Sequence, residues 1–214
     1  MVVDEWIDVE SLSATLSRFL PHAKASALAL TGGVAIQIHC RDAGVSCGRT
    51  RIADVDFVAT DVDAVAPSVA TSLLVAHFHL PHAGYPKFMM QLVDPATRLR
   101  IDVFPDLVAS MTRATERRVA GHWVRVLDVR SILDHKMQTL ARASATRPID
   151  GKHERDARIL AALCGQRIEP IRSDCIAPDV YGMDLTTCVR CDASRTSAFP
   201  VASRKRIFEI LGYN

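Results

Sequence analysis

Residues 51–60 read RIADVDFVAT, and this segment constrains the fold more than any other part of the chain. β-Branched and aromatic residues alternate here with acids, which predicts a half-buried β-strand. Because side chains two residues apart leave a strand on the same face, Asp54 and Asp56 project together, while Val55 and Phe57 face the core. The segment therefore predicts a strand that presents two carboxylates on one side.

The rest of the chain mixes strand and helix patterns and then becomes helical from residue 131. Strand patterns cover residues 26–30, 88–93, 98–104 and 123–127, and helix patterns cover 9–20, 65–74, 131–140, 152–163 and 203–211. Residues 34–40 fit either a helix or a second strand, because so short an apolar run does not separate the two. Residues 142–151 are polar and contain Pro148, which predicts a loop.

This order predicts an α/β (α+β) fold in which a sheet flanked by helices carries a helical appendage and a cysteine-containing tail. The length of 214 residues accommodates one or two domains. We expect an α/β domain over residues 1–128 and a helical subdomain packed on it over 129–168. Residues 169–214 are expected to form the cysteine-containing tail, ending in a helix.

Composition and charge exclude several classes of protein. Charged residues make up 23% of the chain, close to the globular average, which argues against a disordered chain or a coiled coil. The formal net charge of +2 does not predict an extended nucleic-acid-binding surface. Neither a secretory signal nor an apolar run of about 18 residues is visible, so we expect a soluble cytoplasmic protein that does not contact a membrane.

A third acid, Asp102, lies in the strand pattern of residues 98–104 with an apolar residue on each side of it. If the two acidic strands are neighbours, Asp54, Asp56 and Asp102 converge on one surface. Two unit charges about 4 Å apart repel by roughly 4 kcal/mol at an effective dielectric constant near 20, so this cluster needs a cation or a shared proton. Oxygen ligands on rigid strands suit Mg²⁺ or Mn²⁺. The alternative is that Asp54 and Asp56 form the solvated face of an edge strand.

Thr31-Gly32-Gly33 follows the strand pattern of residues 26–30 and adds a second feature. Glycines at this point let the backbone approach a phosphate closely, and the N–H groups at the start of a following helix attract anions. A glycine turn, a pair of acids and a third acid, in this order, form a more specific pattern than any one of them alone. We therefore expect Gly32 and Gly33 to lie against a phosphate group.

With these motifs the sequence resembles the nucleotidyltransferase superfamily, which has the polymerase-β-like fold, and within it the AbiEii-like branch of abortive-infection toxins. The resemblance covers roughly residues 25–165. The matching segments are LTGGVAIQIH (30–39), RTRIADVDF (49–57) and LRIDVF (99–104), followed by SILDHKM (131–137) and KHERDARIL (152–160).

The resemblance implies a mixed sheet flanked by helices and a Mg²⁺-dependent enzyme that transfers a nucleoside monophosphate from a nucleoside triphosphate to an acceptor hydroxyl. By resemblance, Asp54 and Asp56 hold the metal and Asp102 completes the site. The phosphate expected at Gly32 and Gly33 then belongs to the bound nucleotide. The acceptor stays open between an RNA end, a protein and a small molecule, as does an antitoxin partner. Two alternatives also stay open: a catalytically inactive nucleotide-binding or toxin–antitoxin component on the same fold, and a small zinc-dependent nucleic-acid-binding protein.

Basic residues near these motifs are candidates for binding phosphate. Lys136 falls on the apolar stripe of its predicted helix, where a lysine snorkels out, pairs with a buried acid or points into a cleft; we favour a role in nucleotide binding. Lys152 and Asp156 are further nucleotide-site candidates, with a helix-surface ion pair worth about 0.3–0.5 kcal/mol as the alternative. Arg49 and Arg51, beside the acidic strand, are candidates either for contacts to phosphate or for counter-charges to the acids.

The tail contains Cys175, Cys188 and Cys191, and the last two have the C-x₂-C spacing of a zinc knuckle. Structural zinc needs a fourth ligand, which Cys164 or His153 could supply. The alternative is that these cysteines are reduced and pack as small hydrophobic residues.

Overall fold

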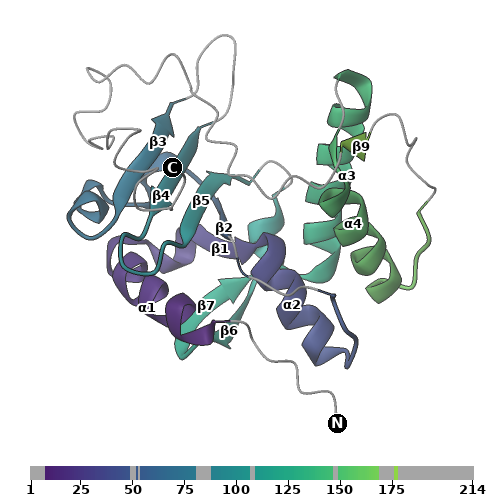
Figure 1. The fold of residues 1–214 in the computed structure, drawn as a ribbon, viewed down its shortest axis with the longest axis horizontal. Helices are drawn as coiled ribbons and strands as arrows, with labels where there is room; N and C mark the ends of the chain where they lie inside the picture. The colour runs from purple at the N-terminus through teal and green to yellow at the C-terminus, as the bar shows by residue number, and fades with distance from the viewer. Residues whose placement is uncertain are drawn as a thin grey trace.

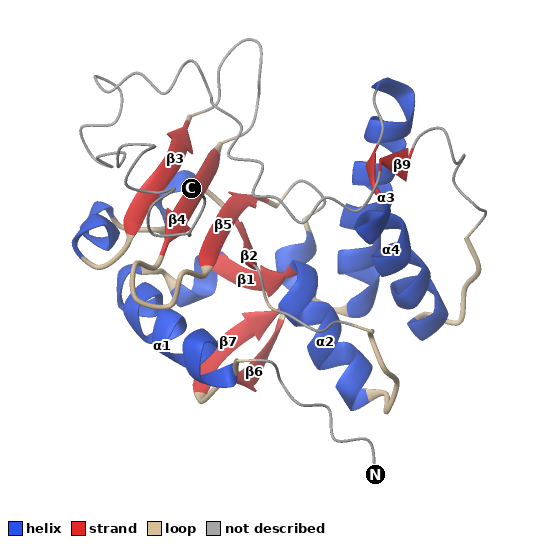
Figure 2. Cartoon of the chain, viewed as in Figure 1, coloured by secondary structure: helices blue, strands red, loops and turns tan. Residues whose placement is uncertain are grey.

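A seven-stranded mixed sheet lies at the centre of the protein (Figure 1, Figure 2). The structure is a computed structural model that describes residues 8–48, 52, 54–80, 88–106, 109–146, 149–168 and 176–177. The strands are β1 (Leu28–Thr31), β2 (Asp54–Ala59), β3 (Leu74–His79), β4 (Met89–Val93), β5 (Arg100–Pro105), β6 (Thr115–Val119) and β7 (His122–Val126). Their order is β3-β4-β5-β2-β1-β7-β6. β2 pairs in parallel with β5, and β1 with β7, whereas the other neighbours are antiparallel.

Helices flank the sheet (Figure 2). In the described part of the chain the α-helices are α1 (Val9–Phe19), α2 (Gly32–Asp42), α3 (Val129–Thr146) and α4 (Gly151–Leu163). The short 3₁₀ segments are η1 (Leu20–His22), η2 (Ala25–Ala27), η3 (Val62–Ala64), η4 (Pro67–Thr71) and η5 (Ser110–Arg113). A small parallel pair, β8 (Ile149–Asp150) and β9 (Ile176–Ala177), lies beside α3 and α4. Figure 1 shows α2, α3 and α4 grouped at the right, whereas α1 lies at the lower left.

The apolar faces of the central strands form the core. Val55 and Phe57 on β2 and Ile101 on β5 are buried, as the alternation of the sequence predicts. The Phe57 ring packs against Phe19 at the end of α1, with 5.1 Å between the ring centres. Since these side chains fix one face of β2 toward the core, the alternating acids project from the opposite face.

Two helices begin at side-chain caps that the local sequence provides. The Asp8 carboxylate accepts a hydrogen bond from the Ser11 N–H at 3.0 Å at the start of α1, and Asp128 accepts one from the Ser131 N–H at 2.7 Å at the start of α3. Such caps satisfy N–H groups that have no partner within the helix. The cap before α3 sets the start of the helix that carries Lys136.

The predicted fold class is confirmed as a mixed sheet flanked by helices, and the predicted strands that precede α3 are present with shifts of up to three residues at their ends. Residues 34–40 belong to α2, which decides between the helix and the strand that the sequence left open. The helix follows directly on β1, so its N-terminus lies at the end of a central strand.

The helix predicted over residues 65–74 is wrong. The chain forms only the short η4, which begins at Pro67, and β3 starts at Leu74. Contacts at the two ends are the physical reason: a bridge between Val65 and Ala23 keeps the backbone extended before Pro67, and Leu74 pairs with Val93 in the sheet. Tertiary pairing overrides a weak local helix pattern at this point.

Two further differences concern segments with little apolar pattern. Strand β6 was not predicted, because only Val119 of its five residues is buried and no alternation marks it. The loop predicted over residues 142–151 is mostly wrong: α3 continues through Thr146, and α4 begins at Gly151. Alanine and arginine, which dominate the start of this stretch, favour helix strongly enough to extend α3.

The domain division into residues 1–128, 129–168 and 169–214 stays a prediction. Apart from 176–177, the tail and its expected helix at 203–211 lie outside the described residues. None of the helices described is long and apolar enough to cross a membrane.

Candidate active site

Three aspartates meet on one face of the sheet. Asp54 and Asp56 lie on β2, Asp102 lies on β5, and the parallel register places Asp56 opposite Asp102. One carboxylate oxygen of each aspartate lies within 4.8 Å of those of the other two. The prediction that three acids converge is therefore confirmed. The alternative that Asp54 and Asp56 lie on an edge strand is wrong, because β2 lies between β5 and β1.

Burial and mutual repulsion raise the pKa of two members of this triad (Asp54, Asp56 and Asp102). Burial, followed by the Asp54 charge, raises the pKa of Asp56 from 3.8 to about 6. Burial also raises the pKa of Asp102 from 3.8 to about 7; the Arg100 charge opposes this rise, and the charges of Asp56 and Asp54 add to it. Asp56 and Asp102 therefore bind protons more readily than ordinary aspartates, and a metal cation would compete with those protons.

Two basic side chains reach the triad. Arg100 Nη2 lies 3.0 Å from Asp54 Oδ2 and 2.8 Å from Asp102 Oδ2. Lys152 Nζ on α4 lies 3.8 Å from Asp54 Oδ1, so this predicted site residue is brought to the acids. Sequence reasoning missed Arg100, although the same rule that pairs Asp54 with Asp56 puts Arg100, two residues before Asp102, on the acidic face.

The donor set of the triad fits a small, hard divalent cation. All three donors are carboxylate oxygens on rigid strands, which is the chemistry that Mg²⁺ and Mn²⁺ take. Asp102 Oδ1 is buried and has no hydrogen-bond partner within the described structure. A buried acceptor without a partner is unfavourable, and coordination to a cation would satisfy it. Asp54, Asp56 and Asp102 are therefore the residues that could hold a metal.

The glycine turn lies directly beside the acids. Thr31, the last residue of β1, is paired with Asp56, and Gly32 opens α2 with a φ of 62°. A Cβ atom on Gly32 would lie 1.8 Å from Asp56 Oδ2, so no other residue leaves the carboxylate in place. Gly33 follows in the first turn of α2 and is buried. The predicted anion-binding turn and the predicted acids thus form one site.

Replacement of Gly32 by alanine is expected to lower the free energy of unfolding by about 2–3 kcal/mol, because it adds left-handed strain and displaces Asp56. Gly44→Ala is the matched control, since Gly44 has a φ of 68° and nothing within 4 Å of an added Cβ. The control keeps the strain of about 1 kcal/mol and lacks the clash. Urea unfolding measures both variants, and equal losses would contradict the contact with Asp56.

Lys136 pairs with a buried acid, which is one of the three roles that its position on α3 allowed. Its Nζ lies 2.9 Å from Asp156 Oδ2 on α4 and 3.4 Å from His153 Nδ1. Because the Asp156 side chain is only 3% exposed, the alternative of a surface pair between Lys152 and Asp156 is wrong. Lys136 and Lys152 both oppose the rise in the pKa of Asp56, so their charges act on the triad.

Lys136→Met is expected to destabilise the protein by about 3 kcal/mol, because it leaves the Asp156 carboxylate buried without its cation. The double variant Lys136→Met/Asp156→Asn removes both charges and is expected to recover at least half of this loss. Arg130→Met on the same helix is the control, since its pair with Asp134 is exposed and is worth about 0.5 kcal/mol or less. Urea unfolding of the wild type and the three variants measures these losses in the free energy of unfolding. A loss for Lys136→Met no larger than that for Arg130→Met would contradict the prediction.

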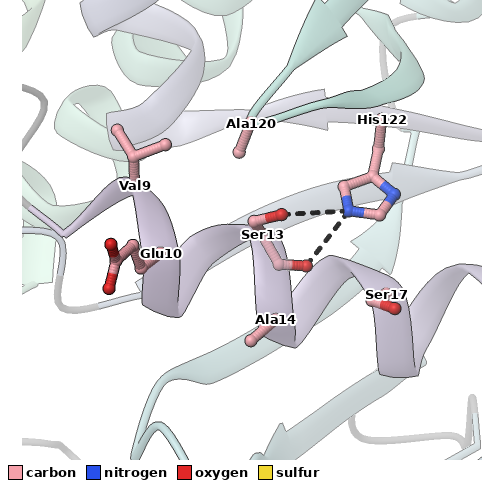
Figure 3. A pocket seen from close by; sticks show the side chains of 7 residues that line it. All are labelled: Val9, Glu10, Ser13, Ala14, Ser17, Ala120 and His122. Atoms are coloured by element: carbon pink, nitrogen blue, oxygen red, sulfur yellow. Dashed lines mark hydrogen bonds between the residues drawn. The ribbon is translucent and has the colours of Figure 1, made fainter.

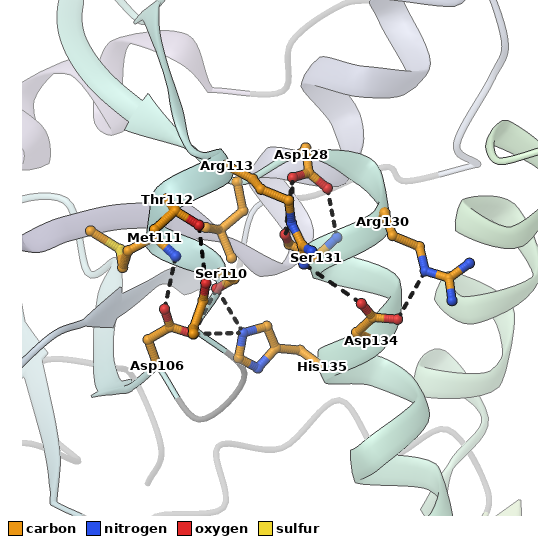
Figure 4. A network of polar contacts seen from close by, with 12 residues as sticks. Asp106, Ser110, Met111, Thr112, Arg113, Asp128, Arg130, Ser131, Asp134 and His135 are labelled. Atoms are coloured by element: carbon orange, nitrogen blue, oxygen red, sulfur yellow. Dashed lines mark hydrogen bonds and ion pairs between the residues drawn. The ribbon is translucent and has the colours of Figure 1, made fainter.

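A polar network fixes the start of α3 against the end of β5 (Figure 4). Asp106 accepts hydrogen bonds from the Ser110 hydroxyl at 2.7 Å and from the Met111 N–H at 2.8 Å. His135 Nε2 lies 3.2 Å from the Ser110 hydroxyl. Since His135 directly precedes Lys136, the network helps to hold the helix that presents Lys136.

A hollow between α1 and the β6–β7 turn contains none of the three aspartates (Figure 3). His122 Nε2 lies 3.3 Å from the Ser13 hydroxyl and 3.1 Å from the Ser13 carbonyl oxygen, so this ring nitrogen contacts α1. The residues that line the hollow are mostly small: Val9, Glu10, Ser13, Ala14, Ser17, Ala120 and His122. They offer no cluster of charge for a metal or a phosphate, which leaves the triad as the candidate site.

Several predicted residues lie outside the described part of the chain. They are Arg49, Arg51, Cys175, Cys188 and Cys191. The two residues suggested as a fourth zinc ligand are described: Cys164 follows α4, and His153 lies beside Lys136, where burial lowers the pKa of its ring to about 4. The zinc site therefore stays a prediction.

No protein-family model matches this sequence, and no curated protein matches it. Among solved structures, the chain is similar to the antibiotic-resistance factor ANT(2'')-Ia, with 15% identity, a TM-score of 0.48 and coverage of 73% of this chain and 85% of that one. It is also similar to an antigenic nucleotidyltransferase-like protein from Paracoccidioides brasiliensis, with 18% identity, a TM-score of 0.40 and coverage of 97% and 98%. Neither likeness is strong enough to assign the chain to a family.

Proposed function

We propose that this protein is a nucleotidyltransferase that uses Mg²⁺ or Mn²⁺ to transfer a nucleoside monophosphate from a nucleoside triphosphate to an acceptor hydroxyl. The observation that carries the proposal is the triad itself, whose oxygens from two adjacent strands lie within 4.8 Å of one another beside Gly32. Carboxylates grouped on a rigid sheet next to an N-terminal helix turn are suited to bind metal and phosphate together.

Each acid has a proposed role in the transfer. Asp54 and Asp56 would hold the cation, which when bound neutralises charge on the phosphates. Asp102 would share the cation or accept the proton of the attacking hydroxyl, because its Oδ1 is buried without a hydrogen-bond partner in the described structure.

The triphosphate would lie between the glycine turn and the basic side chains. Gly32 and Gly33 would offer backbone N–H groups at the start of α2. Lys152, whose side chain is 31% exposed, is the better placed of the two lysines to contact a phosphate oxygen. Lys136 is 13% exposed and would act mainly through its charge, together with its partner Asp156. Arg49 stays a proposed phosphate contact.

The test is metal-dependent binding and turnover of nucleoside triphosphates. We expect a non-hydrolysable triphosphate analogue to bind only with Mg²⁺ or Mn²⁺, and EDTA to abolish that binding. Triphosphates labelled at the α-phosphate, offered with RNA, proteins and small hydroxyl compounds, are expected to release pyrophosphate and label one acceptor class. Absence of metal-dependent binding of any nucleoside triphosphate would overturn the proposal.

A second candidate is a nucleotide-binding protein on the same scaffold without transfer activity. The observation that favours it is the pairing of Arg100 with both Asp54 and Asp102, which occupies two of the three acids. Metal-dependent binding without pyrophosphate release across all acceptors would support this candidate. Membership of the AbiEii-like branch and an antitoxin partner stay proposals that the identity of the acceptor would test.

A further inference from the structure

Arg100 bridges two acids of the triad from within the site. The same nitrogen, Nη2, lies 3.0 Å from Asp54 Oδ2 and 2.8 Å from Asp102 Oδ2, and the Arg100 side chain is 13% exposed. The strand register explains this placement, because Arg100 is paired with Asp54 across β2 and β5 and leaves β5 on the same face as Asp102. A cation bound by both acids would lie close to the positive charge that Arg100 already places on their Oδ2 atoms.

The contacts of Arg100 are incomplete, which indicates that they can be exchanged. Arg100 Nε is buried and has no hydrogen-bond partner in the described structure, and the same is true of Asp102 Oδ1. A guanidinium group forms its strongest contacts when two of its nitrogens donate to one carboxylate or phosphate. A triphosphate would offer Arg100 such an acceptor and would release the oxygens of Asp54 and Asp102.

The competing explanation is that the contacts of Arg100 with Asp54 and Asp102 serve only to hold β2 and β5 together. Six consecutive backbone register pairs, from Asp54↔Arg100 to Ala59↔Pro105, already join β2 to β5. The strands therefore do not depend on a side-chain bridge at one end of the pairing. What the triad does need, when no metal is bound, is a positive charge close to its carboxylates or a shared proton, and Arg100 supplies the charge.

We propose that Arg100 is the built-in counter-ion of the triad, which keeps a divalent cation from binding until a nucleoside triphosphate gives Arg100 another anion to contact. This inference rests on the proposed function of the site. It makes cation binding dependent on the nucleotide, so the free protein holds its acids neutralised by its own side chain.

The experiment measures binding of Mn²⁺ alone by electron paramagnetic resonance. We expect Arg100→Gln to bind Mn²⁺ at least about tenfold more tightly than the wild-type protein without nucleotide, since it removes the competing cation. Adding a non-hydrolysable triphosphate analogue is expected to bring the wild-type protein to a comparable affinity. Arg117→Gln is the control for net charge, because Arg117 pairs with Asp42 at 2.9 Å, away from the triad.

A second variant covers the case in which Arg100→Gln does not fold without metal. Arg100→Lys keeps the charge but replaces the planar guanidinium group, which has several N–H donors, with a single ammonium group. Its Mn²⁺ affinity is expected to lie between those of the wild type and Arg100→Gln. If all variants bind Mn²⁺ with wild-type affinity, the role of Arg100 is overturned and the proposed metal site stands. If none binds Mn²⁺ with or without nucleotide, the proposed function fails, and this inference with it.

Discussion

Asp56→Asn is expected to reduce nucleotidyl transfer by about 10³-fold or more while leaving the fold intact, a loss equivalent to about 4 kcal/mol of barrier. Asparagine keeps the volume of Asp56 against Gly32, where an added Cβ would lie 1.8 Å from Oδ2. It removes one negative oxygen from a group of three that lie within 4.8 Å of one another. Pyrophosphate release with saturating triphosphate measures the effect, and circular dichroism reports the fold.

Asp61→Asn is the matched control, because it makes the same change in charge at an exposed position just beyond β2. Asp61 accepts a hydrogen bond from the neighbouring Thr60 hydroxyl at 2.9 Å. Its effect on turnover is expected to stay within about twofold, as for most surface substitutions. Transfer by Asp56→Asn at the wild-type rate would remove Asp56 from the mechanism and, with it, the proposed use of the triad.

Asp102→Asn is expected to abolish transfer and at the same time to stabilise the protein at pH 8. The folded-state pKa of Asp102 is raised to about 7 from an ordinary value of 3.8, so between these pH values the folded protein binds more protons than the unfolded chain. Stability therefore falls as the pH rises through this window and is lowest above pH 7. Because asparagine has no charge to desolvate, the variant does not lose stability over this pH range.

The gain in the free energy of unfolding that Asp102→Asn produces at pH 8 has an upper bound. The difference between 3.8 and about 7 corresponds to about 4 kcal/mol by proton linkage. We expect about 2 kcal/mol, because the substitution also removes the carboxylate that Arg100 contacts at 2.8 Å. Urea unfolding at pH 4 and pH 8 checks the sign: the two proteins should be similar at pH 4 and differ at pH 8. A variant that is less stable than the wild type at pH 8 would contradict the prediction.

Much of the candidate site follows from local sequence pattern. Alternation around Asp54 and Asp56 fixes which side chains leave β2 on the acidic face, and apolar neighbours do the same for Asp102. The glycines at residues 32 and 33 mark where β1 ends and α2 begins. These features depend on the period of a strand and on the backbone freedom of glycine, both of which act over a few residues.

The partners of the basic residues could not be predicted in this way. Lys136 was expected to face the nucleotide, and the structure pairs it with Asp156 on the next helix. Arg100 was not singled out, because its contact with Asp54 exists only when β5 lies beside β2. The helix predicted over residues 65–74 was wrong for the same reason, since the distant partners of Val65 and Leu74 decide the backbone at its two ends.

The sequence by itself determined the face of each strand on which the acids lie and the position of the glycine turn between strand and helix. Only the tertiary structure decided that β2 is central, that Asp102 is opposite Asp56 and that Arg100 pairs with Asp54 and Asp102. The physical reason is range: side-chain periodicity is set by neighbours in the chain, whereas charge pairing depends on the strand order and register that the buried core selects.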